Sequence, residues 1–296
     1  MGAYCSCCPS APTIGPSRAV ASLFDESGER PSACGRFTAV RLCSAKHPHF
    51  AAAAETLARA FCGSEKTNPD PATGWVYSGT CDSLLAPLPG PPSEKRLQWF
   101  RWLTRMAMHW ALQRGGAYAL LDRAEGVVVA VTLVSPPGAP SVDELGFCGE
   151  LGLICKAGLP PFSTDSERTG AEFGSCMDRM RTLETTLVKA HNELEAEAAG
   201  SGKSGDLHVA MVAADPQRQG QGVGSALLQL VSDIADADAV SAHLETLGER
   251  NEGFYAKKGG YRLAKRVVVQ HKNCRLDLDG GIALMVRPAK CRAESS

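Results

Sequence analysis

One segment of the chain has the glycine spacing of an anion-binding turn. Residues 207–214 form an apolar, strand-like run, which leads through Asp215-Pro216 to three glycines at alternate positions, Gly220, Gly222 and Gly224. A helical pattern of apolar residues follows directly. A strand that ends in glycines and opens a helix points free backbone N–H groups and the positive end of the helix at an anion. The sequence therefore predicts a cradle for a pyrophosphate group.

This turn differs from two common nucleotide-binding loops. A Walker A loop closes with Gly-Lys-Ser/Thr, which the turn lacks, and the upstream Gly202-Lys203-Ser204 has Glu197 where that loop needs its first glycine. A dinucleotide fingerprint needs G-x-G-x-x-G, whereas this turn has G-x-G-x-G spacing and lies late in the chain. A catalytic ATP or GTP site and a nicotinamide site are therefore disfavoured. The structural alternative is a tight turn in which glycine only relieves strain.

The same residues resemble the GNAT acetyltransferase superfamily. Gln219-Gly220-Gln221-Gly222-Val223-Gly224 matches its coenzyme A signature, Q/R-x-x-G-x-G/A. Leu244-Glu245-Thr246, then Asn251 and Phe254-Tyr255-Ala256-Lys257-Lys258-Gly259, is similar to the family's second cofactor motif. The resemblance covers residues 37–288. Within the superfamily, the Pro136-Pro137-Gly138 stop, the helical insert and the L-E-T segment are most similar to puromycin N-acetyltransferase-like proteins.

The resemblance implies acetyl-CoA as the cosubstrate and a set of residues that bind it. The family has a bulged strand around Val212 and Ala213, whose backbone N–H groups would face the developing oxyanion. Arg218 and Lys257 would neutralise phosphate charge. The cofactor-binding residues predicted in this way are Val212, Ala213, Ala214, Arg218, Gln219, Gly220, Gln221, Gly222, Val223, Gly224, Asn251 and Lys257.

Acetyl transfer to an amine also needs a base for the ammonium proton and an acid for the departing thiolate. Tyr255 suits the acid, although a phenol is a weak one. Glu245 and His208 are the candidates for the base, because the resemblance puts them on two strands that splay apart. The structural alternatives are a core tyrosine, a carboxylate that holds a loop and a surface histidine. No metal is expected, because the other histidines show no metal-ligand spacing: His47, His49, His109, His191, His243 and His271.

Two departures from the family concern the surroundings of these residues. Gly259-Gly260-Tyr261 has one glycine more than the family has before its aromatic residue, and Leu207-His208 stands where the family often has aromatics. The first departure affects where the helix before Gly259 ends, and the second affects the wall of the substrate pocket. A further candidate is an aromatic cage for a cationic amine, because one predicted helix contains Trp99, Trp102 and Trp110. The alternative for these tryptophans is a place in the core.

The elements that must position these residues alternate between strand and helix patterns. Strand patterns cover residues 37–42, 117–121, 127–134, 207–214, 241–247, 261–270 and 282–286. Helix patterns cover residues 50–61, a stretch capped by Ser93, much of 141–200 and a segment near 249–258. The resemblance implies an α/β fold with a central mixed, mostly antiparallel sheet flanked by helices and a helical insert before the fourth strand. We expect a disordered tail over residues 1–35 and one GNAT-like domain over residues 36–290.

The composition of the chain limits which partners it can bind and which cellular compartment it occupies. Of 296 residues, 31 are Lys or Arg and 32 are Asp or Glu, so no sequence-wide basic field is present for nucleic acid or an anionic bilayer. The 12 cysteines are mostly scattered, which favours reduced thiols and an intracellular, most simply cytoplasmic, protein. No transmembrane span or secretory signal is expected. Met1-Gly2-Ala3-Tyr4-Cys5-Ser6 fits an acylation motif, so membrane contact is expected only if this end is acylated; a transit peptide or a plain disordered tail is the alternative.

We therefore expect an N-acetyltransferase that moves an acetyl group from acetyl-CoA to a primary amine by direct attack. A small-molecule amine is favoured over a basic protein, because the balanced charge provides no acidic docking field. The Pro-rich loop over residues 63–92 and the helical insert could fold over the splayed strands and close a compact pocket. Two alternatives are a non-catalytic acyl-CoA-binding regulatory module and a membrane-tethered interaction protein. Asn251 and Tyr255 favour catalysis over both, and the oligomeric state stays open.

Overall fold

The structure is a computed structural model that describes residues 16–79, 88–114, 116–139, 146–161, 173–199 and 206–290. The acylation motif at residues 1–6 and the Gly202-Lys203-Ser204 segment lie outside the described residues. Among the helices of the described part, none is long and apolar enough to cross a membrane.

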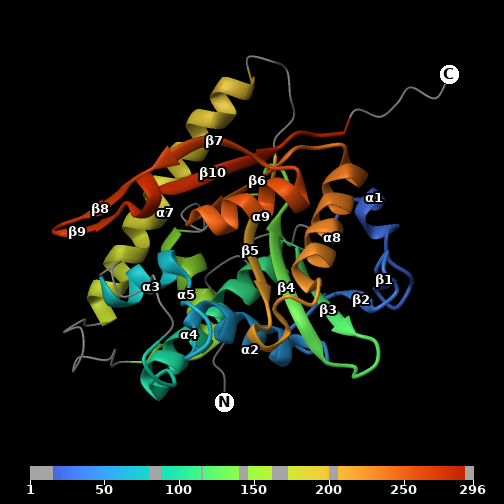
Figure 1. The fold of residues 1–296 in the computed structure, drawn as a ribbon, viewed down its shortest axis with the longest axis horizontal. Coiled ribbons are helices and arrows are strands. Elements are labelled where there is room, and N and C mark those ends of the chain that lie inside the picture. Colours follow the sequence, from blue (N-terminus) through green and yellow to red (C-terminus); the bar gives the residue numbers. More distant parts are fainter. Residues whose placement is uncertain are drawn as a thin grey trace.

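Eight strands of the described residues form one sheet in the order β1-β2-β3-β4-β5-β6-β10-β7 (Figure 1). Their bounds are β1 Glu29–Pro31, β2 Phe37–Arg41, β3 Ala117–Asp122, β4 Val128–Ser135, β5 Leu207–Ala214, β6 Ala242–Thr246, β7 Arg262–Val267 and β10 Ile282–Arg287. Neighbours pair antiparallel except β5 and β6, which run parallel. The predicted mixed, mostly antiparallel sheet is confirmed.

Helices α8 (Val223–Asp238) and α9 (Glu249–Gly259) cover one face of this sheet, with α1 (Arg18–Ala21) beside α8 (Figure 1). The predicted apolar stripe of α8 is buried, with Val223, Leu227 and Val231 in one cluster together with Leu207 and Leu244 of the sheet. Side chains alternate along a strand. The neighbours of Leu207 and Leu244 along these strands therefore point to the opposite face of the sheet. They are His208, His243 and Glu245.

The opposite face is covered by α2 (Phe50–Cys62) and α4 (Glu94–Gln113) over β2 to β5, and by α7 (Phe173–Ala199) towards β7 and β10. Helices α3 (Pro71–Ser78) and α5 (Gly146–Ala157) pack against these. The predicted insert before the strand β5 is thus helical in α5 and α7. Trp99 and Trp102 are only 0% and 1% exposed and belong to the core, so the aromatic cage is wrong.

The start of the domain differs from the prediction. Helix α1 buries Val20, which is 3% exposed, and Phe24 stacks on Tyr118 with ring centroids 5.5 Å apart. Strand β1 pairs with β2. The predicted disordered tail is therefore wrong from residue 16 onwards, and the packed domain begins before residue 36. These elements of four and three residues are too short to show a periodic pattern.

Removal of residues 1–35 should lower the melting temperature, whereas removal of residues 1–15 should leave it nearly unchanged. The longer truncation takes Val20 and Phe24 out of the core, which costs about 3 kcal/mol at 1.5 kcal/mol or more for each buried side chain. It also exposes β2 as a sheet edge. Thermal unfolding of both truncated chains against the full chain measures the difference. Equal melting temperatures for all three would show that α1 and β1 contribute nothing.

The C-terminal part contains two features that the strand pattern did not resolve. The expected strand over residues 261–270 divides into β7 and β8 (Val269–His271), and β8 forms a separate hairpin with β9 (Cys274–Leu276). The extra glycine before Tyr261 also has a reason. Gly260 ends α9 in the left-handed conformation at φ +69°, and a Cβ at Gly259 would lie 2.7 Å from the Tyr261 ring. Both glycines are therefore needed where α9 turns back to the sheet.

Candidate active site

Strands β5 and β6 separate soon after they begin. They pair only at Leu207 with Ala242 and at His208 with His243. On its other edge, β5 remains paired with β4 as far as Ala214. Among the described residues, the edge of β5 that faces β6 therefore has no strand partner from Val209 onwards. Backbone N–H and C=O groups along such an edge are available to an extended ligand.

The bulge of β5 lies earlier than the resemblance implied. The register with β4 shifts between Val209, which faces Val134, and Met211, which faces Leu133, so Ala210 is the extra residue. Val212 and Ala213 instead continue the regular pairing with β4. The expected bulge at these two positions is wrong, and their role as oxyanion donors stays a prediction.

The glycine turn leads from β5 into α8 as the sequence predicted. Asp215 accepts a hydrogen bond from the Gln217 N–H at 3.0 Å, which starts a short 3₁₀ turn. Gly220 and Gly222 have φ values of +77° and +81°, and Gly222 is the N-cap of α8. The first N–H groups of a helix have no partner within the helix. The turn therefore presents free N–H groups at the positive end of a 16-residue helix.

Gly224 has a different reason to be glycine. A Cβ at this position would lie 3.0 Å from Cζ of Phe254 on α9, whereas a Cβ at Gly220 or Gly222 would meet no atom of the described residues within 4 Å. Gly224 thus allows α8 and α9 to approach each other. The open space beside Gly220 and Gly222 leaves room for a ligand.

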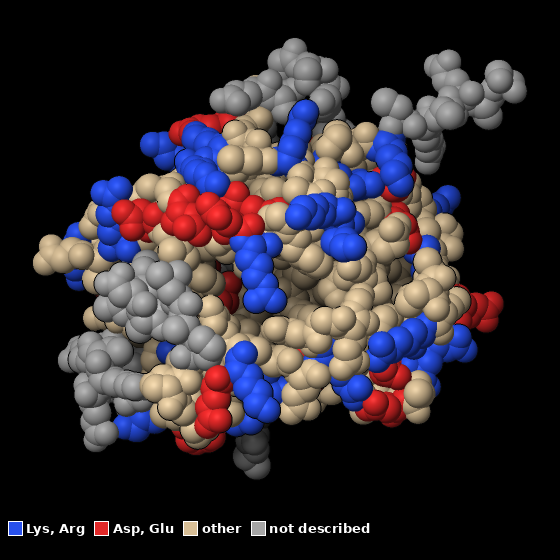
Figure 2. All heavy atoms as spheres, in the orientation of Figure 1, with Lys and Arg blue, Asp and Glu red and all other residues tan. Residues whose placement is uncertain are grey.

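The other predicted cofactor residues lie around this turn and on α9. Arg218 forms an ion pair with Glu125, and Gln221 accepts a hydrogen bond from Arg36 at 2.8 Å. Asn251, on α9, donates to the Leu247 carbonyl at 3.1 Å. Lys257 is exposed on the same helix. On this face of the molecule, Figure 2 shows a central hollow with Lys and Arg side chains along its rim, which suits an anionic ligand.

Four titratable side chains meet on the other face of the sheet, at the point where β5 and β6 separate. Nε2 of His208 lies 3.0 Å from Oε2 of Glu245, and Nε2 of His191 contacts Oε1 of the same carboxylate. The His208 and His243 rings stack with centroids 4.7 Å apart and planes at 8°. The His191 ring lies 4.5 Å from that of His243. We call His191, His208, His243 and Glu245 the His–Glu cluster.

The cluster follows from strand geometry. His243 and Glu245 are two residues apart on β6 and so share a face. His208 is the direct partner of His243 on β5, and α7 brings His191 over the same face. The structure thus joins the two predicted base candidates. His191 and His243 were not among the predicted site residues, although the His-x-Glu spacing on a predicted strand was the available signal.

The members of the cluster shift one another's pKa values. Burial raises the pKa of Glu245, but the charges and hydrogen bonds of His208 and His191 outweigh burial and hold it well below the usual range. Burial lowers the pKa of His208, but Glu245 outweighs this effect, so the net shift is upward. Burial and the neighbouring histidines hold the pKa of His243 well below its usual range. The carboxylate is therefore ionised, and His243 is neutral near pH 7.

Tyr255 lies on α9 beside Tyr261, with ring centroids 6.0 Å apart. Burial raises the pKa of its phenol, and the charges of Tyr261, Asp70 and Glu245 raise it further. The hydroxyl is therefore neutral at physiological pH, and it can donate a proton.

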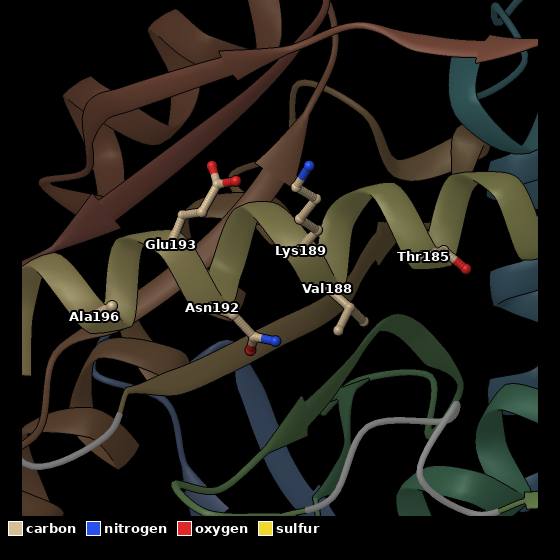
Figure 3. A pocket seen from close by; sticks show the side chains of 6 residues that line it. All are labelled: Thr185, Val188, Lys189, Asn192, Glu193 and Ala196. Carbon is tan, nitrogen blue, oxygen red and sulfur yellow. The ribbon is translucent and has the colours of Figure 1, made fainter.

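Two surface hollows lie beside these elements. The first, of about 470 Å³, runs along α7 and is lined by Thr185, Val188, Lys189, Asn192, Glu193 and Ala196 (Figure 3). These residues come from one helix, so the hollow does not by itself define a ligand site. The second, of about 490 Å³, adjoins the glycine turn and is lined by residues that include Arg36, Gln221, Gly222 and Ser225.

The chain is similar to one family model and to several solved structures. Residues 185–261 match the family model "Acetyltransferase (GNAT) family". Arylalkylamine N-acetyltransferase 2 from Aedes aegypti has 12% sequence identity and a TM-score of 0.50, over 86% of this chain and 99% of that chain. A protein from Corynebacterium glutamicum described as "histone acetyltransferase HPA2 and related acetyltransferase" has 18% identity and a TM-score of 0.47, over 86% of this chain and 97% of that chain. A comparison with curated proteins gives no match.

The strands that separate, the glycine turn before α8 and the helices on both faces of the sheet are the features of the GNAT fold. This chain has the GNAT fold, and the segment that matches the family contains α7 residues from 185 on, the glycine turn, β6 and α9. The similarity to puromycin N-acetyltransferase-like proteins stays a prediction.

Proposed function

We propose that the protein transfers an acetyl group from acetyl-CoA to a primary amine of a small molecule. The main support for the proposal is that the glycine turn and the His208–Glu245 pair both lie beside the gap between β5 and β6. The glycine turn at the start of α8 lies on one face of the sheet, and the His208–Glu245 pair lies on the other. Both adjoin the gap between β5 and β6. A thioester held from one face can thus meet an amine that arrives from the other.

Acetyl-CoA supplies the acetyl group as a thioester, and the protein supplies the groups that move protons and stabilise charge. His208, oriented by Glu245, accepts the proton that the amine loses as its nitrogen bonds to the acetyl carbon. Backbone N–H groups on the free edge of β5 stabilise the developing oxyanion. As the carbon–sulfur bond breaks, Tyr255 donates a proton to the thiolate. The products are the amide and free coenzyme A.

A compact amine fits this arrangement better than a lysine on a protein. The His208 and Glu245 side chains are 28% and 14% exposed, and His191 of α7 lies against the Glu245 carboxylate. A base under a helix is accessible to a small molecule but not to the backbone of a bulky partner. In addition, the chain's formal net charge of −1 offers a basic protein no attractive field.

Mass spectrometry of acetyl-CoA with a mixed panel of small amines tests the proposal, with lysine-rich peptides at the same amine concentration as competitors. We expect acetylated small amines and free coenzyme A. Faster acetylation of the peptides would refute the small-molecule acceptor. Binding of acetyl-CoA without any acetylated product would favour the non-catalytic acyl-CoA-binding module instead. EDTA in the assay keeps adventitious metal ions away from the His–Glu cluster.

Tyr255→Phe should lower kcat about tenfold while leaving acetyl-CoA affinity nearly unchanged. A leaving-group acid acts in the transition state, and its loss therefore appears in kcat rather than in ground-state binding. Steady-state kinetics and calorimetry measure the two quantities.

Tyr261→Phe is a matched control for this change. Its hydroxyl is buried and has no hydrogen-bond partner in the described part of the chain, so its removal should alter neither turnover nor affinity. Equal turnover of Tyr255→Phe and the unaltered protein would exclude Tyr255 as the acid.

A further inference from the structure

We propose that the His–Glu cluster is a binding site for a divalent transition-metal cation of the Zn²⁺ type. The cluster offers three imidazole nitrogens and one carboxylate oxygen, a donor set that suits such cations. The expectation of no metal came from the spacing of histidines along the chain. That spacing does not report a set drawn from α7, β5 and β6, so the expectation loses its basis.

The four donor atoms already lie near the distances that a cation requires. All of them are within 4.8 Å of one another, and His208 Nε2 is 3.0 Å from Glu245 Oε2. Ligands of a tetrahedral zinc ion, each bonded at about 2.0–2.1 Å, lie about 3.4 Å from one another. Side-chain shifts of about 1 Å would therefore bring all four into coordination.

Hydrogen bonding alone leaves part of the cluster unexplained. Glu245 is contacted by His208 and His191, yet the third ring, His243, is also directed into the group and is stacked on His208. His191 Nε2 and Glu245 Oε1 are buried atoms in direct contact with each other, and neither has any other hydrogen-bond partner within the described residues. A cation that accepts a lone pair from each would satisfy both atoms.

An outer carboxylate also fits this assignment. Oδ2 of Asp206 lies 3.9 Å from Nδ1 of His243, and Ser241 donates a hydrogen bond to the same carboxylate. A carboxylate that accepts a hydrogen bond from the second ring nitrogen commonly orients a ligating histidine and raises its basicity, and Asp206 would form this bond by a closer approach to His243. With Asp206 beside Nδ1, Nε2 of His243 is left for the cation.

Occupancy would have a consequence for catalysis, and this step rests on the proposed function. The cation would take the lone pairs of His208 and Glu245 that the proposed base needs. We therefore expect Zn²⁺ to inhibit acetyl transfer reversibly, with activity restored by a chelator.

Calorimetric titration of the EDTA-treated, dialysed full-length protein with Zn²⁺ tests the site, with Co²⁺ absorption as a report on tetrahedral coordination. We expect one Zn²⁺ per chain and an intense visible Co²⁺ spectrum. His191→Ala and His243→Ala should each weaken Zn²⁺ binding at least tenfold. His271→Ala is the control, because this histidine bonds Thr182 of α7 outside the cluster and should bind like the unaltered protein. Circular dichroism confirms that each variant is folded.

The binding outcomes are independent of acetyl transfer. Absence of Zn²⁺ binding, or equal binding by the folded cluster variants and the unaltered protein, would overturn the metal site and leave the proposed function standing. Binding that the cluster variants lose supports the site even if no amine is ever acetylated. Zn²⁺ bound in the cluster without inhibition of an active enzyme would support the site and contradict His208 as the base.

Discussion

Replacing His208 with alanine is expected to lower kcat/KM for acetyl transfer about 100-fold or more, because a positioned base commonly contributes this much to a proton transfer. Acetyl-CoA affinity should stay within about twofold, since His208 lies at the start of β5 and the glycine turn follows its other end. Steady-state kinetics in EDTA and calorimetry with acetyl-CoA measure both quantities.

Glu245→Gln distinguishes a coupled pair from two separate contributions. The amide keeps the shape of the side chain but loses the charge that orients His208. If the two residues act as one unit, the double variant should be no slower than His208→Ala alone. If the fold-losses in kcat/KM of the two single variants multiply in the double variant, His208 and Glu245 do not act as one unit. An unchanged kcat/KM in His208→Ala would exclude His208 as the base. His271→Ala controls for the general loss of a histidine next to α7.

The glycine turn and its flanking elements could be predicted from the sequence because their signals are local. The apolar run over residues 207–214 coincides with β5, and the helix pattern from Val223 coincides with the start of α8. Asp215, Gly220 and Gly222 then act within the same few residues, where backbone conformation and capping depend on near neighbours. The family signature falls in this local segment.

The His–Glu cluster could be predicted only in part because its geometry is not local. Its members are drawn from α7, β5 and β6, and the parallel register of His208 with His243 is set by how the whole sheet assembles. The sequence pointed to His208 and Glu245 as separate candidates. Their contact, and the addition of His191, needed the packing of α7 across the sheet.

The N-terminal elements and α3 were missed for a different reason. Helix α1 has four residues. It is stabilised by Val20 and Phe24, which pack into a core whose other residues come later in the sequence. Helix α3 had the correct local signals, Asp70 as N-cap and Pro71 in the first turn, but it lies inside a Pro/Gly-rich stretch that reads as a loop. Short elements of this kind depend on tertiary contacts more than on periodicity.

Replacing Gly222 with valine is expected to weaken acetyl-CoA binding more than tenfold, which corresponds to about 1.4 kcal/mol or more. Gly222 has φ +81°, a conformation that a β-branched residue adopts only with strain. No atom of the described residues lies within 4 Å of the new Cβ, so the loss would come from a displaced turn and from a side chain in the space that the phosphates need. Calorimetry with acetyl-CoA measures the affinity, and thermal unfolding measures the strain.

Gly138→Val separates strain from ligand contact. Gly138 has φ +72°, and no atom of the described residues lies within 4 Å of a Cβ there, so valine should cost similar stability. It follows β4, whose last residue, Ser135, pairs with His208 at the start of β5, whereas the glycine turn follows the far end of β5. Its acetyl-CoA affinity should therefore match that of the unaltered protein. Equal affinity losses in the two variants would attribute the effect to strain alone, and a folded Gly222→Val with full affinity would show that the turn does not hold the phosphates.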